Sequence, residues 1–297
     1  MKNRITFKIW LMAARPKTLP AAIAPVLIGT VLAFKDGGFH LLSAILVMAA
    51  ALLMQVGTNF VNDYADFKKG SDTDRRVGPV RVTQAGLVSP EKMKKAVYFV
   101  FSLVILVSLY LVLRGGIPVL VIGILSIISA ITYTAGPFPI GYKGFGDIFV
   151  LIFFGPVAVA GTYFVQSLSI NIIPVIAGLG PGFLSVAILV VNNIRDVDED
   201  KISGKNTLVV RFGIIFGRFE YFISVMIAFT LPFFLFLSGA GTNYSFLTIL
   251  LTLFLLKPYR ALTVENDPAS LNALLGYTGK LLLLYSIVFC AGWMFPL

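Results

Sequence analysis

The sequence has little charge and almost no histidine or cysteine. Charged residues make up 13% of its 297 residues, whereas soluble domains carry about 25%. Hydrophobic residues make up 58%, so lipid is the expected solvent for much of the surface. The single histidine, His40, and the single cysteine, Cys290, are too few for a zinc or copper site or for an intramolecular disulfide.

Long apolar runs dominate the chain. Each is long enough to cross the roughly 30 Å hydrocarbon core of a bilayer as a helix, and the short alternating segments of a β-barrel are not seen. The basic start runs into RPKTLP and not into a small-residue cleavage site, so no cleavable signal peptide is expected. We predict a single all-α, polytopic membrane domain over residues 1–297. Its nine predicted spans are approximately residues 19–35, 41–60, 96–113, 117–135, 147–166, 172–192, 219–238, 244–260 and 279–296.

The basic residues lie almost wholly in alternate loops. One predicted side of the membrane carries 22 of the 24 lysines and arginines, and the exceptions are Lys35 and Arg114. Basic loops stay cytoplasmic. We therefore predict an inner-membrane protein with a cytoplasmic N-terminus and an external C-terminus. The same distribution accounts for the net charge of +10 without a nucleic-acid partner.

Eight of the fourteen acidic residues occupy two short windows, one after the second predicted span and one after the sixth. Residues three, four and seven apart share one face of a helix, so each span should end in a polar stripe. Two stripes that meet across a bundle would collect several carboxylates and amides in one pocket. The first stripe comprises Asn59, Asn62, Asp63 and Asp66, and the second comprises Asn192, Asp196 and Asp200.

Oxygen ligands in this pattern suit Mg²⁺, which also binds substrate phosphates. Basic residues follow both stripes, and lysine and arginine bind phosphate oxygens. Mg²⁺ flanked by basic side chains makes diphosphate a better leaving group, so the sequence predicts an enzyme that acts on a diphosphate. The expected diphosphate-binding residues are Lys68, Arg75, Arg76 and Arg81 after the first stripe, and Arg195, Lys201 and Lys205 around the second, and Lys69 and Arg211 are further basic neighbours.

Other interpretations of the clusters are weaker. Loops next to a membrane are often charged simply because they are wet, but two clusters that both open with asparagine favour a function. A secondary transporter would place its charges near the bilayer midplane, although prolines such as Pro156 and Pro181 interrupt spans and keep that alternative open. A non-catalytic assembly factor would not need paired stripes. The glycine-rich GYKGFGD from Gly141 to Asp147 lies between membrane spans and predicts no dinucleotide site.

The two stripes resemble the aspartate motifs of the UbiA superfamily of intramembrane prenyltransferases. NNIRDVDED, from Asn192 to Asp200, fits the NxxxDxxxD form fully, whereas NDYAD, from Asn62 to Asp66, is followed by Gly70 and then Asp72. The flanking sequence, from RPKTLPAAIAPVLIGT through YTAGPFPIGYKGFGD, is similar to the members of that family that act on 1,4-dihydroxy-2-naphthoate. The likeness covers residues 15–213, and the last three spans match in hydrophobicity alone.

The resemblance implies nine transmembrane helices around a central cavity and transfer of a polyprenyl group from polyprenyl diphosphate to 1,4-dihydroxy-2-naphthoate, with decarboxylation, to give demethylmenaquinone. Another acceptor, such as 4-hydroxybenzoate or homogentisate, remains an alternative because pocket shape sets the acceptor. Arg15 and Lys17 are candidates for the acceptor carboxylate and equally for positive-inside anchors. The implied Mg²⁺ ligands are Asn62, Asp63, Asp66, Asp72, Asn192, Asp196 and Asp200, although Asp63 could instead support the ligands from behind. Asp63, Asp66, Asp196 and Asp200 are the implied catalytic residues, and Asn59, Arg15 and Lys17 the implied substrate-binding residues.

Overall fold

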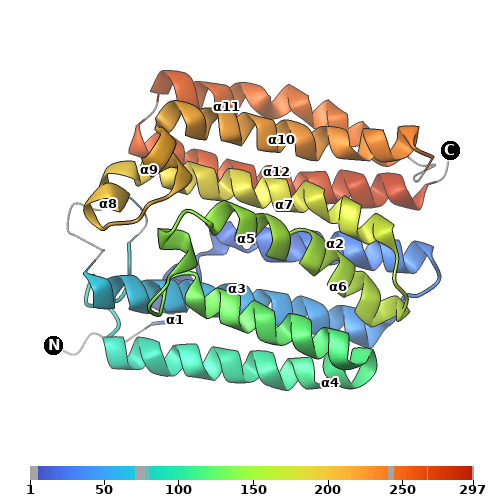
Figure 1. The fold of residues 1–297 in the computed structure, drawn as a ribbon, viewed down its shortest axis with the longest axis horizontal. Helices are drawn as coiled ribbons and strands as arrows, with labels where there is room; N and C mark the ends of the chain where they lie inside the picture. The colour runs from blue at the N-terminus through green and yellow to red at the C-terminus, as the bar shows by residue number, and fades with distance from the viewer. Residues whose placement is uncertain (1–5, 71–77, 79, 240–243, 266, 296–297) are drawn as a thin grey trace.

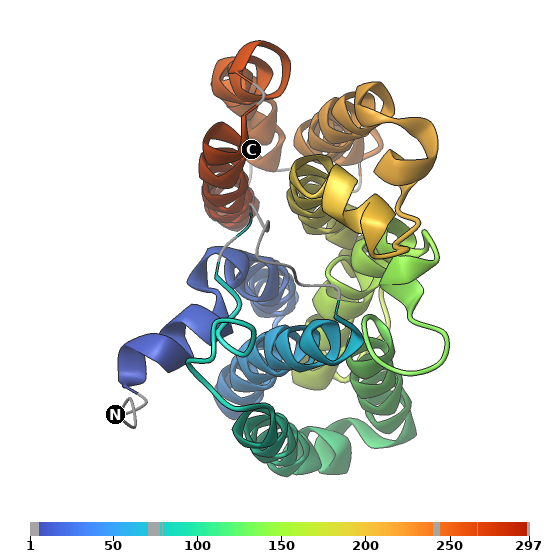
Figure 2. The same ribbon diagram turned by 90° about the vertical axis from the view of Figure 1, so that its left-hand side faces the viewer.

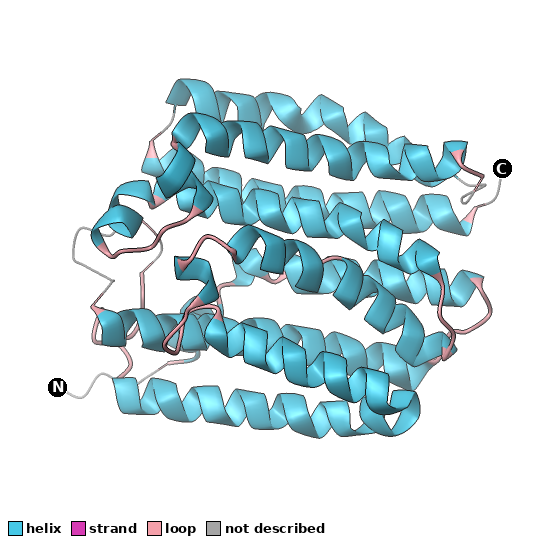
Figure 3. Ribbon diagram, in the orientation of Figure 1, coloured by secondary structure: helices cyan, strands magenta, loops and turns pink. Residues whose placement is uncertain are grey.

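The structure, a computed structural model, describes residues 6–70, 78, 80–239, 244–265 and 267–295. Within these ranges every regular element is a helix, which confirms the predicted all-α class (Figure 3). Seven of the described helices are long and apolar enough to cross a membrane, and a bent helix pair at the N-terminal end gives up to eight. The chain is therefore a multi-pass membrane protein.

Most of the described helices follow one another along the chain with short connections, and the longest connection, residues 70–89, joins α3 to α4. Elements labelled η are 3-10 helices, except η4, which is a π-helix. The elements are α1 (Phe7–Ala14), η1 (Pro16–Thr18), α2 (Pro20–Lys35), α3 (Leu41–Lys69), α4 (Pro90–Thr132), η2 (Ile140–Tyr142), α5 (Gly146–Phe153), α6 (Pro156–Ser167), α7 (Ile172–Arg195), α8 (Val197–Ile202), α9 (Leu208–Phe212), α10 (Ile214–Leu237), η3 (Tyr244–Leu255), α11 (Leu256–Arg260), η4 (Ala261–Glu265) and α12 (Pro268–Met294).

The predicted count of nine spans is not confirmed as such. Two predicted spans, 96–113 and 117–135, together form α4, which breaks at Gly116, where φ is 69°. Glycine adopts this left-handed conformation without steric cost, and Figure 1 shows the second half of α4 running back beside the first. The first predicted span corresponds to α2, which is bent by 56° from the Phe7–Thr18 segment.

Helix α7 lies at the centre of the packing. It contacts α2, α5, α6, α10 and α12. Two glycines on α7 allow close approach: a Cβ at Gly178 would lie 2.7 Å from the Pro156 Cα, and one at Gly182 would lie 2.7 Å from the Leu151 carbonyl oxygen. Small residues four positions apart are a common means of packing membrane helices closely, and here they bring α7 against the junction of α5 and α6.

One end of the bundle collects the polar segments. Figures 1 and 2 show α1, α8, α9 and the C-terminal end of α3 at the same end, opposite the C-terminal end of α12. The two basic residues predicted for the other side both bind helix C-terminal carbonyls. Lys35 donates to Met294 at 3.2 Å, and Arg114 donates to Val165 and Gln166 at 2.8 and 2.9 Å. Cations stabilise helix C-termini, so both exceptions to the charge pattern have a local structural role.

Candidate active site

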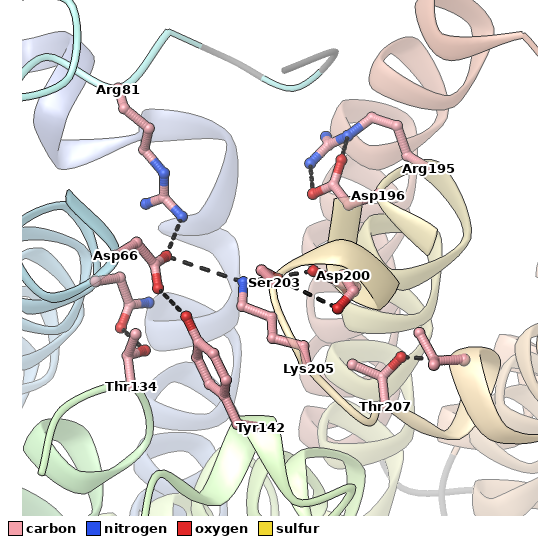
Figure 4. A network of polar contacts seen from close by, with 12 residues as sticks. Asp66, Arg81, Thr134, Tyr142, Arg195, Asp196, Asp200, Ser203, Lys205 and Thr207 are labelled. Carbon is pink, nitrogen blue, oxygen red and sulfur yellow. Dashed lines mark hydrogen bonds and ion pairs between the residues drawn. The ribbon is translucent and has the colours of Figure 1, made fainter. Parts of the chain in front are cut away.

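The first acidic stripe lies on the last turns of α3, which continues well beyond the predicted end of its span. Asp66 is 2% exposed, and its carboxylate accepts hydrogen bonds from the Tyr142 hydroxyl at 2.8 Å and from the Arg81 guanidinium at 2.7 Å (Figure 4). One turn earlier, Asn62 accepts a hydrogen bond from the Thr134 hydroxyl. Asp66 is thus held by side chains from two separate segments, η2 and the α3–α4 connection.

The second stripe is not one continuous helix. Asn192 lies on α7, Asp196 caps that helix, and Asp200 lies on the short α8. The Arg195 guanidinium donates to both oxygens of Asp196, each at 2.6 Å. Burial raises the pKa of Asp200 to about 6, and the nearby positive charge of Lys205 opposes this rise.

Lys205 connects the two acidic segments. Its Nζ lies 3.5 Å from Asp200 and 4.0 Å from Asp66, between the two carboxylates in Figure 4. A single ammonium group near two buried carboxylates offsets part of their mutual repulsion. The structure therefore brings the ends of α3 and α8 together, as the two stripes predict.

These side chains line one polar cavity of about 340 Å³. Its wall combines carboxylates, amides and cations from α3, α7, α8, η1 and the loops, so the cavity suits a highly charged group. The predicted site residues that line it are Arg15, Lys17, Asn62, Asp66, Arg81, Asn192, Arg195, Asp196, Asp200 and Lys205.

A second cavity of about 360 Å³ is lined mainly by apolar and small side chains of α2 to α7. On α3 its lining extends from Asn62 to Val47, which corresponds to about 22 Å of helix. Together the cavities can hold a charged head group with a long apolar tail. The residues that line both cavities are Arg15, Thr18, Asn62, Tyr133, Leu189 and Asn192.

Tyr142 and Thr134 are site residues that the sequence analysis missed. The Tyr142 ring centroid lies 4.1 Å from the Lys69 ammonium and 5.1 Å from that of Lys205, so the ring contacts two cations. Its backbone carbonyl accepts a hydrogen bond from Asn206 at 2.9 Å. The position of its segment could have indicated Tyr142, because GYKGFGD follows the fourth predicted span on the same side of the membrane as the acidic clusters.

Asn59 and Asp63, both predicted as site residues, each hold a neighbouring segment of the chain through hydrogen bonds. Asn59 donates to the Ala14 carbonyl at 2.9 Å and to the Thr18 hydroxyl at 3.1 Å, and so ties α3 to η1. Asn59 lines the apolar cavity. Asp63 accepts hydrogen bonds from a neighbouring loop and is absent from the described lining of both cavities.

Other predicted basic residues lie outside the polar cavity. The Lys68 ammonium lies 5.9 Å from the Tyr64 ring centroid, and exposed Lys201 pairs with Asp198 at 3.7 Å. Arg211 donates to the Lys143 carbonyl at 2.6 Å. The remaining predicted residues, Asp72, Arg75 and Arg76, lie outside the described residues.

The donor set suits Mg²⁺ in kind but is not assembled around a metal position. Within the described ranges, no group of three or more acidic, histidine or cysteine side chains could hold a metal ion as placed. The oxygen donors of Asp66, Asp196 and Asp200 nevertheless line one cavity with three asparagine amides, and these are the ligand types that Mg²⁺ prefers. Each carboxylate has a basic neighbour, as buried carboxylates require.

A model of the UbiA prenyltransferase family matches residues 22–288. The chain belongs to the UbiA prenyltransferase family. It is 38% identical to the 1,4-dihydroxy-2-naphthoate octaprenyltransferase of Escherichia coli (strain K12) over 290 residues. The aligned region covers 95% of this chain and 94% of the relative. The enzyme of the same name from Bacillus subtilis (strain 168) is 34% identical over 205 residues, which are 69% of this chain and 66% of the relative.

Solved structures share the fold of this UbiA-family chain. A UbiA homolog from Archaeoglobus fulgidus, bound to DMAPP and Mg²⁺, superposes with a TM-score of 0.63 at 16% identity, covering 95% of this chain and 99% of that one. A structure of digeranylgeranylglyceryl phosphate synthase gives a TM-score of 0.57 at 18% identity, with 96% and 97% coverage. At these identities the likeness establishes the fold.

Proposed function

We propose that this protein transfers a polyprenyl group from polyprenyl diphosphate to 1,4-dihydroxy-2-naphthoate, with loss of the acceptor carboxylate. The observation that carries the proposal is the junction of a charged cavity with a long apolar one, which matches a diphosphate head and its prenyl tail. The near full-length similarity to 1,4-dihydroxy-2-naphthoate octaprenyltransferases supports the choice of acceptor.

The polar cavity would bind the diphosphate. Arg81, Arg195 and Lys205 line it and lie next to carboxylates, so they can bind peripheral phosphate oxygens. Mg²⁺, when bound, supplies charge neutralisation of the departing diphosphate. The complex of the Archaeoglobus fulgidus homolog with DMAPP and Mg²⁺ supports this requirement. The residues that would hold the metal are Asn62, Asp66, Asn192, Asp196 and Asp200.

The acceptor carboxylate would bind at Arg15. This residue lines both cavities, and its φ of 52° lies in the left-handed region. Arginine adopts that conformation at a cost, and such strain gathers at functional sites. Asn59 holds the segment around Arg15 in place through its hydrogen bonds to Ala14 and Thr18. Lys17 also lines the polar cavity and places a further cation near Arg15.

The apolar cavity would exclude water from the reacting allylic carbon. In the proposed reaction the carbon–oxygen bond to diphosphate breaks, and diphosphate leaves with the electron pair. The ring carbon that carries the carboxylate forms the new carbon–carbon bond, and loss of carbon dioxide returns an electron pair to the ring. The product is the quinol form of demethylmenaquinone.

We also propose that the polar end of the bundle faces the cytoplasm, in the inner membrane. The 22 basic residues of the predicted cytoplasmic side support this orientation. The C-terminus would then lie outside. Reporter fusions at each terminus would test this, and a cytoplasmic C-terminal reporter would contradict the proposal.

The deciding experiment is an assay of the purified protein in detergent with Mg²⁺, geranylgeranyl diphosphate and 1,4-dihydroxy-2-naphthoate, with 4-hydroxybenzoate as a competing acceptor. Mass spectrometry follows the products. We expect a decarboxylated prenyl-naphthoquinol or its quinone, and no such product after EDTA is added. A product formed solely from 4-hydroxybenzoate would retain the reaction type and refute the acceptor.

A further inference from the structure

Asp63 differs from its neighbours on the acidic stripe. It is 2% exposed, and both of its carboxylate oxygens are engaged by backbone. Oδ2 accepts a hydrogen bond from the Val82 N–H and Oδ1 accepts one from the Thr83 N–H, each at 3.1 Å. Two charge-assisted hydrogen bonds to consecutive amides fix both the position and the direction of that backbone.

The backbone that Asp63 holds belongs to a compact turn. Within it, the Ala85 N–H donates to the Arg81 carbonyl at 2.9 Å, and the Leu87 N–H donates to the Val82 carbonyl at 3.0 Å. The Val82 side chain is fully buried, in a cluster with apolar side chains of α1, α3 and α4. The turn is therefore anchored at Val82 and Thr83, directly beside Arg81.

Arg81 is the functional group that this anchor places. It is 5% exposed, lines the polar cavity and pairs with Asp66 at 2.7 Å. An arginine side chain has many rotamers. The Arg81 side chain reaches the polar cavity because the backbone of the next residue, Val82, is fixed by Asp63. Asp63 and Asp66 thus bind the same loop, one through the backbone and one through the guanidinium.

We infer that Asp63 is a positioning residue that holds Arg81 over the diphosphate, and not a ligand of the metal. The inference rests on the proposed function for the role of Arg81. If the Asp63 carboxylate turned to a metal ion, two buried N–H groups would lose their acceptor, which is unfavourable. Adjacent helix positions also point about 100° apart, so Asn62 can line the cavity while Asp63 faces the loop.

Amide hydrogen exchange on the wild-type protein gives a first test. Peptides that cover Val82 and Thr83 are followed in Mg²⁺-free buffer, and again with Mg²⁺ and a non-ionisable prenyl diphosphate analogue at saturating concentration. We expect these amides to be protected in both states. A marked rise in their exchange rate with Mg²⁺ and the analogue, or no protection in either state, would overturn the inference.

A double-mutant cycle tests the link to Arg81. Asp63→Asn should raise KM for the prenyl diphosphate about tenfold, leave kcat largely intact and leave the Mg²⁺ concentration for half-maximal activity unchanged. Arg81→Ala should do the same, and adding Asp63→Asn to it should have little further effect. Independent, multiplying effects, or an increased Mg²⁺ requirement for Asp63→Asn, would refute the positioning role.

A matched control lies in the same turn. Thr83→Ala removes a buried side chain but keeps the N–H that Asp63 accepts, so its KM for the prenyl diphosphate should equal that of the wild type. If Asp63→Asn does not fold, the exchange experiment on the wild-type protein decides. Absence of any prenylated product from the wild type would refute the proposed function, whereas the exchange result would still report on Asp63.

Discussion

Three segments far apart in the sequence converge on the carboxylate of Asp66. Tyr142 and Arg81 bind it directly, and Lys205 lies 4.0 Å away. We expect Asp66→Asn to lower turnover at least about 100-fold, because preorganised charge in a buried site contributes strongly to catalysis. Prenyl transfer by the purified variant, titrated with Mg²⁺, measures the effect.

Asp198→Asn is the matched control for that substitution, since Asp198 belongs to an acidic cluster but its side chain is highly exposed. It should behave as the wild type. Asp66→Asn should also melt at a lower temperature, because it leaves buried Arg81 without its full counter-charge. Wild-type turnover of Asp66→Asn at limiting Mg²⁺ would contradict its role as a metal ligand.

Substitutions at Tyr142 can separate the contributions of its hydroxyl and of its ring to stability and activity. Tyr142→Phe loses the bond to Asp66 but keeps the ring beside Lys69 and Lys205. We expect the free energy of unfolding to fall by about 1 kcal/mol, as for one hydrogen bond, and kcat/KM to fall about tenfold. Tyr142→Ala should cost more in both measurements, and a Tyr142→Phe variant as impaired as Tyr142→Ala would refute the role of the hydroxyl.

At the residue scale, helical spacing predicts which side chains of α3 share a face, and tertiary packing determines what each of them contacts. Asn62 and Asp66 share a helix face and both line the polar cavity. Asp63 sits on the adjacent face, where the loop at Val82 meets α3. Tertiary packing determines which surface that loop covers. The position of the loop therefore cannot be predicted from the residue spacing on α3 or from the sequence of the loop.

At the scale of elements, the contact of α7 with the α5–α6 junction depends on glycine. A Cβ at Gly178 would lie 2.7 Å from the Cα of Pro156, an atom of the backbone that cannot move aside easily. We expect Gly178→Ala to lower stability by about 1–3 kcal/mol, typical of overpacking. Thermal unfolding in detergent measures this.

Gly161→Ala on α6 is the corresponding control, because a Cβ there meets no described atom within 4 Å. Alanine is also the better helix former, so this variant should be at least as stable as the wild type. Equal melting temperatures for Gly178→Ala and the wild type would show that the junction can relax.

The sequence predicted helix positions well and helix continuity less well. Each predicted span falls largely on described helices, because long apolar runs have one stable form in lipid, although 147–166 is divided between α5 and α6 and 244–260 between η3 and α11. The interruptions were harder to predict: α4 reverses at Gly116, and the second acidic stripe breaks at Asp196 between α7 and α8. Such a break depends on the backbone dihedral angles of one residue. The pattern of hydrophobic residues along the chain does not report those angles.

For the whole molecule, the pairing of acids with bases predicts that the metal is needed for activity and not for folding. Asp66, Asp196 and Asp200 each have a basic partner in the described structure, so their charge is offset without a metal. We expect EDTA to abolish product formation while the protein keeps its helical circular dichroism and a cooperative melt. Loss of helical signal on addition of EDTA at 25 °C would contradict this.

The junction of the two cavities has a kinetic consequence under the proposed function. A donor whose tail lies in the apolar cavity arrives from the bilayer, so its mole fraction in lipid, and not its bulk molarity, determines how often the site is filled. Added detergent or lipid at constant total donor should slow turnover by surface dilution, whereas a water-soluble acceptor should show an unchanged KM. The rate would then depend on the density of the prenyl donor in the plane of the membrane and on the concentration of the acceptor in solution.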